Sequence, residues 1–386
     1  MGALDERQAW IALASVTGVA EELMGQLLSR FGSASEVLAS ACDGRLRRWA
    51  TTERRSRGFR ALPATLLDGI AGVARDPRQI LGAIEGAGLW TLTPLDADYP
   101  PGLRDLDPPP NLLHGWGAAA ALNADRRVAI VGTRRPTAAG RLLAARLAVR
   151  LVECGATVVS GLAVGIDGAA HAACAERDGR TVGVIGAGHG SPGPRAHAAL
   201  RARILEASGA IVSEHHPDVR ASKGTYPRRN RIIAALAEAV LVVEAPVRSG
   251  ALITARHALD LGRPVYVAPG RIGDWSVAGA LALLRDTPAR PLVGLDELIA
   301  DLGYFTSRGA AAAPGPVTRP AALAMLGRAE HAVAVRLCSG PAGLDALVRD
   351  TDLPPAAVSG AVTMLLMRGW VQAIGPAYLP CGPLLG

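Results

Sequence analysis

Short apolar runs alternate with amphipathic segments through the middle of the chain, between about residues 89 and 305. Such runs predict strands buried on both faces of a sheet, and the amphipathic segments between them have helical periodicity. The alternation predicts right-handed βαβ crossovers and an α/β, Rossmann-like domain on a parallel sheet. The predicted strands are Val128–Val131, Thr157–Ser160, Thr181–Ile185, Ala210–Ser213, Val240–Glu244 and Val265–Ala268, and the predicted helices include Gly140–Val152, Gly168–Glu176 and Gly250–Leu261.

Residues 1–88 have a helical pattern instead. Ala9–Leu13 and Leu23–Phe31 are amphipathic and flank the turn Val16-Thr17-Gly18-Val19. An apolar-x-Gly-apolar turn is typical of a helix-hairpin-helix, or SAM-like, domain, in which backbone N–H groups can meet a phosphate. A plain helical turn explains the same residues, and both interpretations stay open. The arginines that follow, between Arg45 and Arg60, are more often a solvated face than a binding site.

The C-terminal part predicts a third domain. Residues 306–320 are rich in alanine, glycine and proline, which predicts a linker. Helical patterns then cover Ala332–Leu337, Leu344–Arg349 and Ala356–Met367, and short apolar segments near Val371 and Tyr378 predict a hairpin. This order is typical of a winged helix-turn-helix, predicted here for residues 321–386.

The distribution of charge along the sequence indicates which part of the chain binds the predicted anionic partner. The net charge of +7 and the pI near 9.6 indicate an anionic ligand. Residues 89–320 hold 26 basic and 20 acidic residues, whereas residues 1–88 carry a net charge of +1 and residues 321–386 are neutral. The predicted anion site therefore belongs to the Rossmann-like domain. The five cysteines form no CxxC pair and no apolar leader opens the chain, so we expect a cytoplasmic protein without a metal site.

The stretch Tyr226–Leu236, YPRRNRIIAAL, is the most charged motif of this domain. Arg228, Arg229, Asn230 and Arg231 directly precede the apolar face of a predicted helix. The helix macrodipole disfavours cations at that end, so a compensating anion is expected. A phosphate that meets backbone N–H groups and guanidinium forks fits this expectation.

Glycine- and arginine-rich loops follow several predicted strands, at the edge where parallel sheets bind ligands. Glycine permits a tight turn there, and threonine, serine and arginine side chains offer donors to a phosphate. The candidate residues of these loops are Gly132, Thr133, Arg134, Ser160, Gly161, Ser249 and Gly250.

Other residues give little indication of catalysis. Gly186–Gly190 fits a dinucleotide fingerprint poorly, because its third glycine comes too early and no acidic residue suited to a ribose follows. Asp167 is predicted to cap a helix, and His171 to be a packed histidine rather than a metal ligand. We therefore expect no cofactor and no catalytic residues.

Together these segments resemble the DNA-processing family DprA, also called Smf. The resemblance spans residues 95–270, and Tyr226–Ile233 is its most specific part. The other signatures, in order, are Tyr99-Pro100, Asp107-Pro108-Pro109 with Leu113-His114-Gly115, Val131–Arg134, Ser160–Asp167 with His171, Thr181–Gly186, Ser213-Glu214, Val242–Ala245, Ser249-Gly250 and Pro269-Gly270.

The resemblance implies a non-catalytic homodimer, paired through the Rossmann-like domain, that binds single-stranded DNA and loads RecA recombinase onto it during natural transformation. The arginines of Tyr226–Leu236 would face the DNA backbone, and Tyr226, where the family usually has Phe, keeps a ring for base stacking. Other departures are Ser191–Pro194 in place of a Tyr-Pro pair, and Leu281 and Thr287 near the family's usual asparagine and glycine.

Two rival functions remain. Nucleoside-monophosphate phosphoribohydrolases share a similar sheet, but they carry a P-G-G-x-G-T-x-x-E segment, and Ala245–Ile253 has no glutamate after its glycine. A transcription regulator would use the winged helix, whose zero net charge is unfavourable for binding a duplex.

Overall fold

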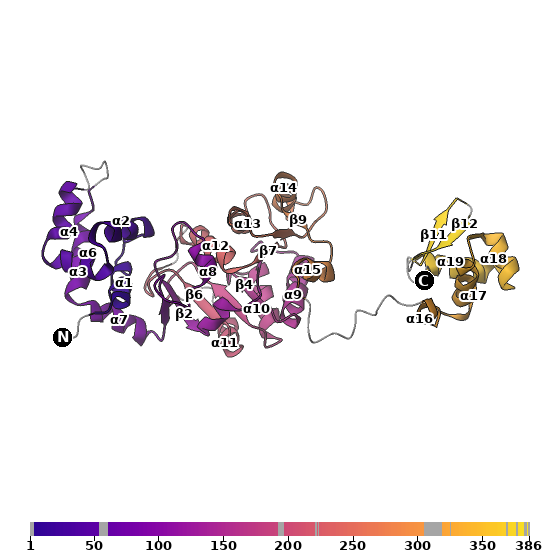
Figure 1. Ribbon diagram of the computed structural model, residues 1–386, viewed down its shortest axis with the longest axis horizontal. Helices are drawn as coiled ribbons and strands as arrows, with labels where there is room; N and C mark the ends of the chain where they lie inside the picture. Colours follow the sequence, from indigo (N-terminus) through magenta and orange to yellow (C-terminus); the bar gives the residue numbers. More distant parts are fainter. Residues whose placement is uncertain are drawn as a thin grey trace. The chain divides into compact units, whose positions relative to one another are not determined.

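The computed structural model forms two compact units, Met1–Phe305 and Thr306–Gly386 (Figure 1). The residues described are 4–53, 61–191, 197–220, 222, 224–304, 319–324, 326–367, 370–375, 377–381 and 384. Most of the predicted linker, Arg54, Arg55, Arg57 and Arg60 of the arginine cluster, and Pro192–Pro194 lie outside these residues. The division of residues 1–305 at residue 88 stays a prediction.

All N-terminal helices but the last enclose one apolar core, and the last, Pro77–Gly86, packs through Ile84 in a second, smaller one. Leu13, Leu27 and Val37 are fully buried in the larger core. Asp5 begins the first helix with a capping box to Gln8, and Gly18 adopts a φ of 98° in the predicted turn, which favours glycine. The elements are α1 (Glu6–Ala14), α2 (Glu21–Phe31), α3 (Ala34–Cys42), α4 (Arg45–Arg48), the π-helical turn η1 (Trp49–Glu53), α6 (Ala64–Arg75) and α7 (Pro77–Gly86).

A sheet of nine strands follows, in the order β1-β2-β6-β5-β4-β3-β7-β8-β9. All neighbours from β6 to β9 pair in parallel, as the apolar runs predicted. The strands are β1 (Trp90–Leu92), β2 (Leu113–Gly117), β3 (Arg127–Val131), β4 (Thr157–Ser160), β5 (Thr181–Val184), β6 (Ala210–Ser213), β7 (Ala239–Val242), β8 (Val265–Val267) and β9 (Arg290–Pro291).

At one edge the predicted parallel sheet is extended by two antiparallel strands that the sequence did not predict. β2 pairs antiparallel with β6, and β1 pairs antiparallel with β2. β2, with the sequence LHGWG, has no apolar run, so its strand character was not evident. Trp90 lies opposite Gly115, and a Cβ at Gly115 would come within 2.1 Å of the Trp90 ring. The indole therefore occupies the space that a side chain at Gly115 would fill, and this packing stabilises the pair.

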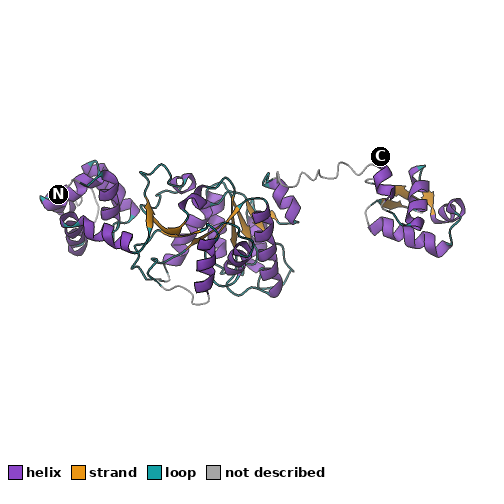
Figure 2. Ribbon diagram, turned by 90° about the horizontal axis from the view of Figure 1, so that it is seen from below, coloured by secondary structure: helices purple, strands orange, loops and turns teal. Residues whose placement is uncertain are grey.

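Helices cover both faces of the sheet, and Figure 2 shows the strands between them. Val128 and Ile130 pack in the core beneath α9, α10 and α15, whereas Ala129 and Val131 pack in the core beneath α8, α12, α13 and α14. This alternation is the period of two expected of a strand. The elements are α8 (Pro101–Arg104), the 3₁₀ helix η2 (Ala119–Asn123), α9 (Ala138–Glu153), α10 (Ile166–Ala175), α11 (Ala198–Glu206), α12 (Thr225–Leu236), α13 (Ala251–Asp260), α14 (Ala278–Asp286) and α15 (Leu295–Asp301).

The order of the strands creates a topological switch point. The chain proceeds outward from β3 through β4 and β5 to β6, and α12 then leads it back to β7 on the other side of β3. Since connections leave β3 and β7 in opposite directions, a crevice opens between the loops at their carboxyl ends. Ligands of open α/β sheets bind at such a point.

The second unit has the predicted winged-helix elements. Val358, Val362 and Leu365, which are spaced as one face of a helix, are buried, and Ser359, Gly360 and Thr363 are exposed. Its elements are α16 (Arg319–Ala324), α17 (Arg328–Cys338), β10 (Ala342–Gly343), α18 (Leu344–Thr351), α19 (Pro355–Met367), β11 (Val371–Ile374) and β12 (Ala377–Pro380), and the strands form one sheet in the order β10-β12-β11.

Candidate nucleic-acid interface

A pocket of about 840 Å³ lies at the switch point, and we call it the switch-point pocket. The loops after β3 and β7, the first half of α12 and Trp275 line it. Most of the residues predicted from the sequence meet here: Gly132, Thr133, Arg134, Tyr226, Arg229, Asn230, Ser249 and Gly250. Distant segments of the chain therefore build one concave surface.

The loop after β3 is held by a buried carboxylate. Glu244 accepts hydrogen bonds from the backbone N–H of Thr137, at 2.9 Å, and from its hydroxyl, while its carbonyl accepts one from the N–H of Thr133 at 2.7 Å. Thr137 in turn caps α9. A Cβ at Gly140 would come within 2.4 Å of the Glu244 carboxyl group. Since both carboxylate oxygens of Glu244 are engaged, this residue fixes the loop and leaves ligand contacts to the loop's own side chains.

Arg134 projects from this fixed loop toward solvent. A Cβ at Gly132 would come within 2.5 Å of the Ile166 side chain, so glycine allows the loop to pack tightly on α10. The Arg134 guanidinium stacks over the Tyr226 ring, 5.2 Å from the ring centroid. In the part of the chain that the structure describes, Arg134 has no carboxylate within ion-pair distance. It is therefore an exposed cation that an anionic ligand can reach.

Arg229 forms the floor of the pocket. It is 4% exposed, and it donates hydrogen bonds to the carbonyl of Gly161, at 2.6 Å, and to that of Val184. These bonds tie α12 to the ends of β4 and β5. Burial lowers the pKa of Arg229 to about 10, although the negative charge of Asp167 acts to raise it. Burial also raises the pKa of the Asp167 carboxyl group. The guanidinium stays charged at neutral pH.

Asp167 does not cap a helix as predicted. Gly165 occupies the N-cap of α10, and Asp167 lies in the first turn, where its carboxylate accepts the Gly161 N–H at 3.1 Å. Ser160 is fully buried and donates to the carbonyl of Ile130, while Gly161 lines a smaller neighbouring cavity of about 90 Å³. Ser160 and Gly161 therefore support the pocket from outside it.

Asn230 and Ser249 order the opposite wall. The amide of Asn230 donates to the Gly250 carbonyl at 3.0 Å, which joins α12 to the start of α13. The Ser249 hydroxyl accepts a hydrogen bond from the N–H of Ala251 at 3.3 Å, next to Gly250, which is the N-cap of α13.

His171, which the sequence predicted to be a packed histidine, is a core residue. It is fully buried, and its Nδ1 lies 2.7 Å from the Thr181 hydroxyl.

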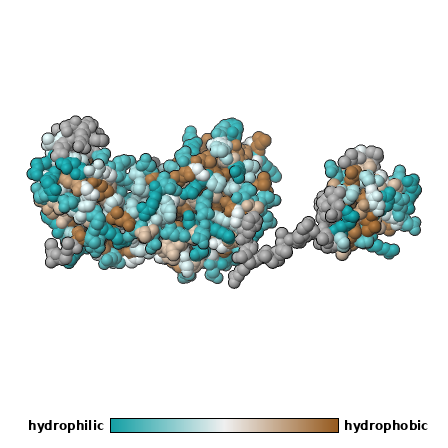
Figure 3. All heavy atoms as spheres, in the orientation of Figure 1, coloured by the Kyte–Doolittle hydropathy of each residue, from teal (hydrophilic) through white to brown (hydrophobic). Residues whose placement is uncertain are grey.

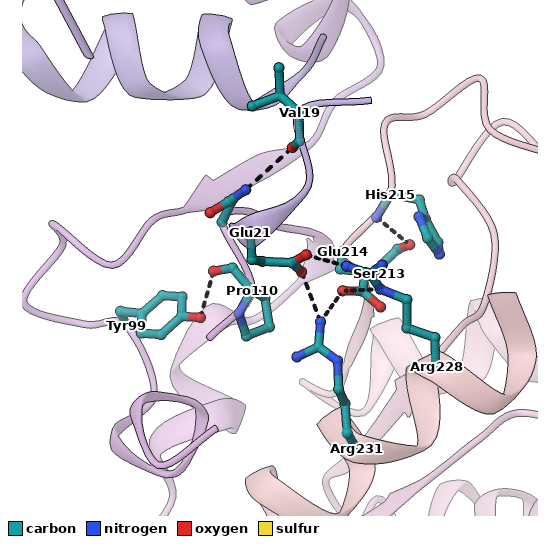
Figure 4. Close-up of polar contacts among 10 residues, drawn as sticks. Val19, Glu21, Tyr99, Pro110, Ser213, Glu214, His215, Arg228 and Arg231 are labelled. Carbon is teal, nitrogen blue, oxygen red and sulfur yellow. Dashed lines mark hydrogen bonds and ion pairs between the residues drawn. The ribbon is translucent and has the colours of Figure 1, made fainter. Parts of the chain in front are cut away.

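Arg228 and Arg231 do not line the pocket. Together with Glu21 and Glu214 they form what we call the ionic cluster, drawn in Figure 4. Arg231 lies 2.9 Å from Glu21 and 2.5 Å from Glu214, and Arg228 contacts the same two carboxylates. Two buried carboxylates thus balance two cations, and α2 is bound to α12.

We call Arg228, Arg229 and Arg231 the arginine run. Their positive charges are balanced by groups other than the expected one. The sequence suggested a phosphate, but Glu21 and Glu214 balance Arg228 and Arg231, and Asp167 lies close to Arg229. The helix also begins at Thr225, so these arginines follow its first turn. Arg134, from a different loop, remains available to a ligand, because no carboxylate of the described residues lies within ion-pair distance of it.

Sequence reasoning missed several residues of this region. Trp275, Arg135 and Arg248 also line the pocket. Arg135 and Arg248 belong to loops that the sequence had already indicated, so their positive charge could have identified them as candidate site residues. Trp275 lies in the loop after β8, beyond the Pro269-Gly270 signature and outside any predicted motif, and Glu21 lies 207 residues from Arg228.

The described residues contain neither a candidate metal site nor a candidate membrane span. Among these residues, no group of three His, Cys, Asp or Glu side chains is placed to hold a metal ion. No helix within the described ranges has both the length and the apolar character needed to cross a membrane.

Comparison with known proteins relates the chain to one family. It matches the family model described as DNA recombination-mediator protein A over residues 90–303, and the DprA winged helix domain over residues 317–375. The DNA processing protein DprA of Bacillus subtilis is 38% identical over 207 residues, which cover 54% of this chain and 69% of that protein.

Two solved structures extend the comparison. DNA processing protein A from Streptococcus pneumoniae superposes with a TM-score of 0.63 at 26% identity, covering 78% of this chain and 99% of that one. DNA processing protein A from Helicobacter pylori, solved for its single-stranded DNA binding mode, has a TM-score of 0.51 at 29% identity, covering 55% of this chain and 95% of that one.

The ionic cluster gives a prediction about stability. Glu21→Gln removes the charge of a carboxylate that is 8% exposed, while the two arginines it contacts stay in place. We expect the free energy of unfolding to fall by about 1.5–3 kcal/mol. Glu22→Gln, at the exposed neighbouring position, is the matched control and should have little effect.

The pH dependence checks the same assignment. Burial raises the pKa of Glu21, but hydrogen bonding to Arg228 and the charges of Arg228 and Arg231 outweigh burial and hold it below the ordinary value of 4.5. The stabilisation is therefore present above that value and is lost as the pH falls through the lowered pKa. Urea unfolding should show a difference between wild type and Glu21→Gln at neutral pH that shrinks in acid. Equal effects of Glu21→Gln and Glu22→Gln would contradict the assignment.

Proposed function

The chain belongs to the DNA recombination-mediator protein A family, whose members carry the names DprA and Smf, and from this premise we propose that it binds single-stranded DNA in the switch-point pocket. The family places the protein in DNA processing. The observation that supports a DNA site at the pocket is Arg134, an exposed cation on a rigid loop, stacked on an aromatic ring inside an open crevice.

The chemistry of the pocket suits a sugar-phosphate chain. Arg134, Arg135 and Arg248 supply guanidinium groups, and the glycines of both loops bring backbone close to a ligand. The net positive charge of the sequence lies almost entirely in residues 89–320. A strand bound here would release counterions from its phosphates, which makes its affinity depend on salt.

The ring of Tyr226 favours a single strand over a duplex. Aromatic rings stack on unpaired bases of any sequence, whereas the bases of a duplex are already stacked on each other. The pocket offers few side chains arranged to read base edges. Binding is therefore largely independent of sequence.

Three parts of the proposal rest on the family resemblance: RecA loading onto the bound strand, a homodimer formed through residues 89–305, and the absence of catalysis. Light scattering tests the dimer. Faster nucleation of RecA on DNA coated with single-strand-binding protein tests the loading step, and an unchanged rate would contradict it. Release of adenine from AMP by the purified protein would indicate the phosphoribohydrolase activity instead.

Arg134→Ala should weaken binding to a single-stranded oligonucleotide and reduce the salt slope by about 0.7, the value of one lost phosphate contact. Arg285→Ala makes the same change of charge at an exposed residue of α14, beside Asp286, and serves as the control. Arg231→Ala should destabilise the fold but leave the salt slope unchanged, because its charge is balanced within the ionic cluster. A lowered slope for Arg231→Ala and an unchanged one for Arg134→Ala would reverse the assignment.

Competition between a mixed-sequence single strand and the matching duplex tests the preference for unpaired bases. We expect the single strand to displace a labelled oligonucleotide at a much lower concentration than the duplex does, because only unpaired bases can stack on Tyr226. Scrambling the sequence should change little. Equal competition by the duplex would mean that phosphate contacts alone hold the DNA.

The winged helix is expected to contribute little to this binding. Residues 321–386 have no net charge, and α19 contains no Lys or Arg. Truncation after residue 305 keeps Tyr304, whose hydroxyl donates to Glu238 at 2.7 Å, within the first unit. Affinity for single strands should stay within about tenfold, or 1.4 kcal/mol, of the full chain. A larger loss, with the melting temperature unchanged, would place the winged helix in the DNA site.

A further inference from the structure

Trp275 is an exposed aromatic residue at the switch-point pocket. Its side chain is 66% exposed and lines the pocket together with Tyr226 and Arg248. It belongs to the loop between β8 and α14, at the same edge of the sheet as the loops after β3 and β7. Figure 3 shows hydrophobic residues among hydrophilic ones on the surface over α13 and α14.

The backbone around Trp275 is held in place. The N–H of Ser276 donates to the Asp274 carboxylate at 2.8 Å, and the next residue, Val277, is buried in the sheet core. Further along, the N–H of Ala280 donates to the Ala245 carbonyl at 2.9 Å, which fastens the start of α14 to the loop after β7. The exposure of the indole is therefore a property of a fixed loop.

Trp275 also differs from the four other tryptophans of the first unit. Trp10, Trp90 and Trp116 donate their indole N–H groups to backbone carbonyls at 2.8 to 3.1 Å, and Trp49 is 4% exposed. Within the part of the chain that the structure describes, no aromatic ring or guanidinium stacks on Trp275. An indole with an uncovered face, at a cationic pocket, lacks the packing partner that such a large apolar ring usually has.

The second ring of the pocket is already covered on one face. The Arg134 guanidinium stacks on Tyr226, 5.2 Å from the ring centroid, and a Cβ at Gly186 would come within 3.1 Å of the same ring. Trp275 is the larger ring, and no such cation covers it among the described residues. A flat apolar group entering the pocket would therefore find its widest uncovered surface at Trp275.

We propose that Trp275 is a stacking platform for one unpaired base of the bound strand, an inference that rests on the proposed function. The guanidinium groups of the pocket hold phosphates, and the indole holds a base of the same strand. Stacking uses the face that every base has, so Trp275 adds affinity without choosing a sequence. A flat protein surface would not require the cations that line the same pocket.

The test compares two oligonucleotides with the same backbone, oligo(dT) and its abasic counterpart. Trp275→Ala should weaken binding to oligo(dT) by at least about fivefold and leave binding to the abasic strand unchanged, because only the base contact is lost. Trp275→Phe keeps a ring and should retain most of the affinity. Ile272→Ala is the matched control: it removes an apolar side chain that is 97% exposed in the same loop and is not among the residues that line the pocket.

Fluorescence gives an independent measurement on the unmodified protein. Oligo(dT) should quench the tryptophan emission of wild type, and Trp275→Phe should abolish that quenching while the protein still binds. The salt slope of Trp275→Ala should equal that of wild type, since no phosphate contact is removed.

The outcomes separate the two proposals. If wild type binds neither oligonucleotide, the proposed function fails and the stacking role fails with it. If wild type binds oligo(dT) and Trp275→Ala binds it equally well, the stacking role alone is wrong. Equal losses on oligo(dT) and the abasic strand would also overturn it, because they would show that Trp275 acts on the shape of the loop.

Discussion

One buried cation holds the site together. The Arg229 guanidinium joins α12 to the carboxyl ends of β4 and β5, with Asp167 as its nearby counter-charge. These bonds fix the helix that presents Tyr226 and Asn230 to the pocket. Because Arg229 is satisfied by backbone carbonyls, it shapes the floor and leaves the exposed cations of the surrounding loops to bind a ligand. Loss of this residue would leave Asp167 as an uncompensated buried charge, which is costly.

The arginine run therefore has two structural tasks in addition to any contact with DNA. Arg229 organises the pocket, and Arg228 and Arg231 bind the N-terminal helices through Glu21. Both tasks concern the same helix, so the position of α2 and the geometry of the pocket are physically linked. Arg134, an exposed candidate for a phosphate contact, is supplied by the loop after β3, and Glu244 holds that loop rigid.

The sequence predicted the parallel strands well because their residues are buried on both faces, so hydrophobic runs coincide with strands: β4 and β6 have the predicted bounds. It predicted the pocket because glycine- and arginine-rich loops at the ends of parallel strands converge. It missed β2, where Gly115 leaves the space that the Trp90 ring fills. It also missed the pairing of Glu21 with Arg228 and the role of the loop at Trp275, since both depend on distant segments brought together by folding.

Photo-crosslinking of a single strand that contains 4-thiothymidine tests the central claim, that the switch-point pocket is the DNA site. Mass spectrometry of the digested complex identifies the peptides that carry a crosslink. We expect crosslinks in peptides that contain Tyr226 or Trp275 and in the loop that contains Arg134, all of which line the pocket. Crosslinks confined to the arginine-rich segment between Arg45 and Arg60, or to the winged helix, would contradict it.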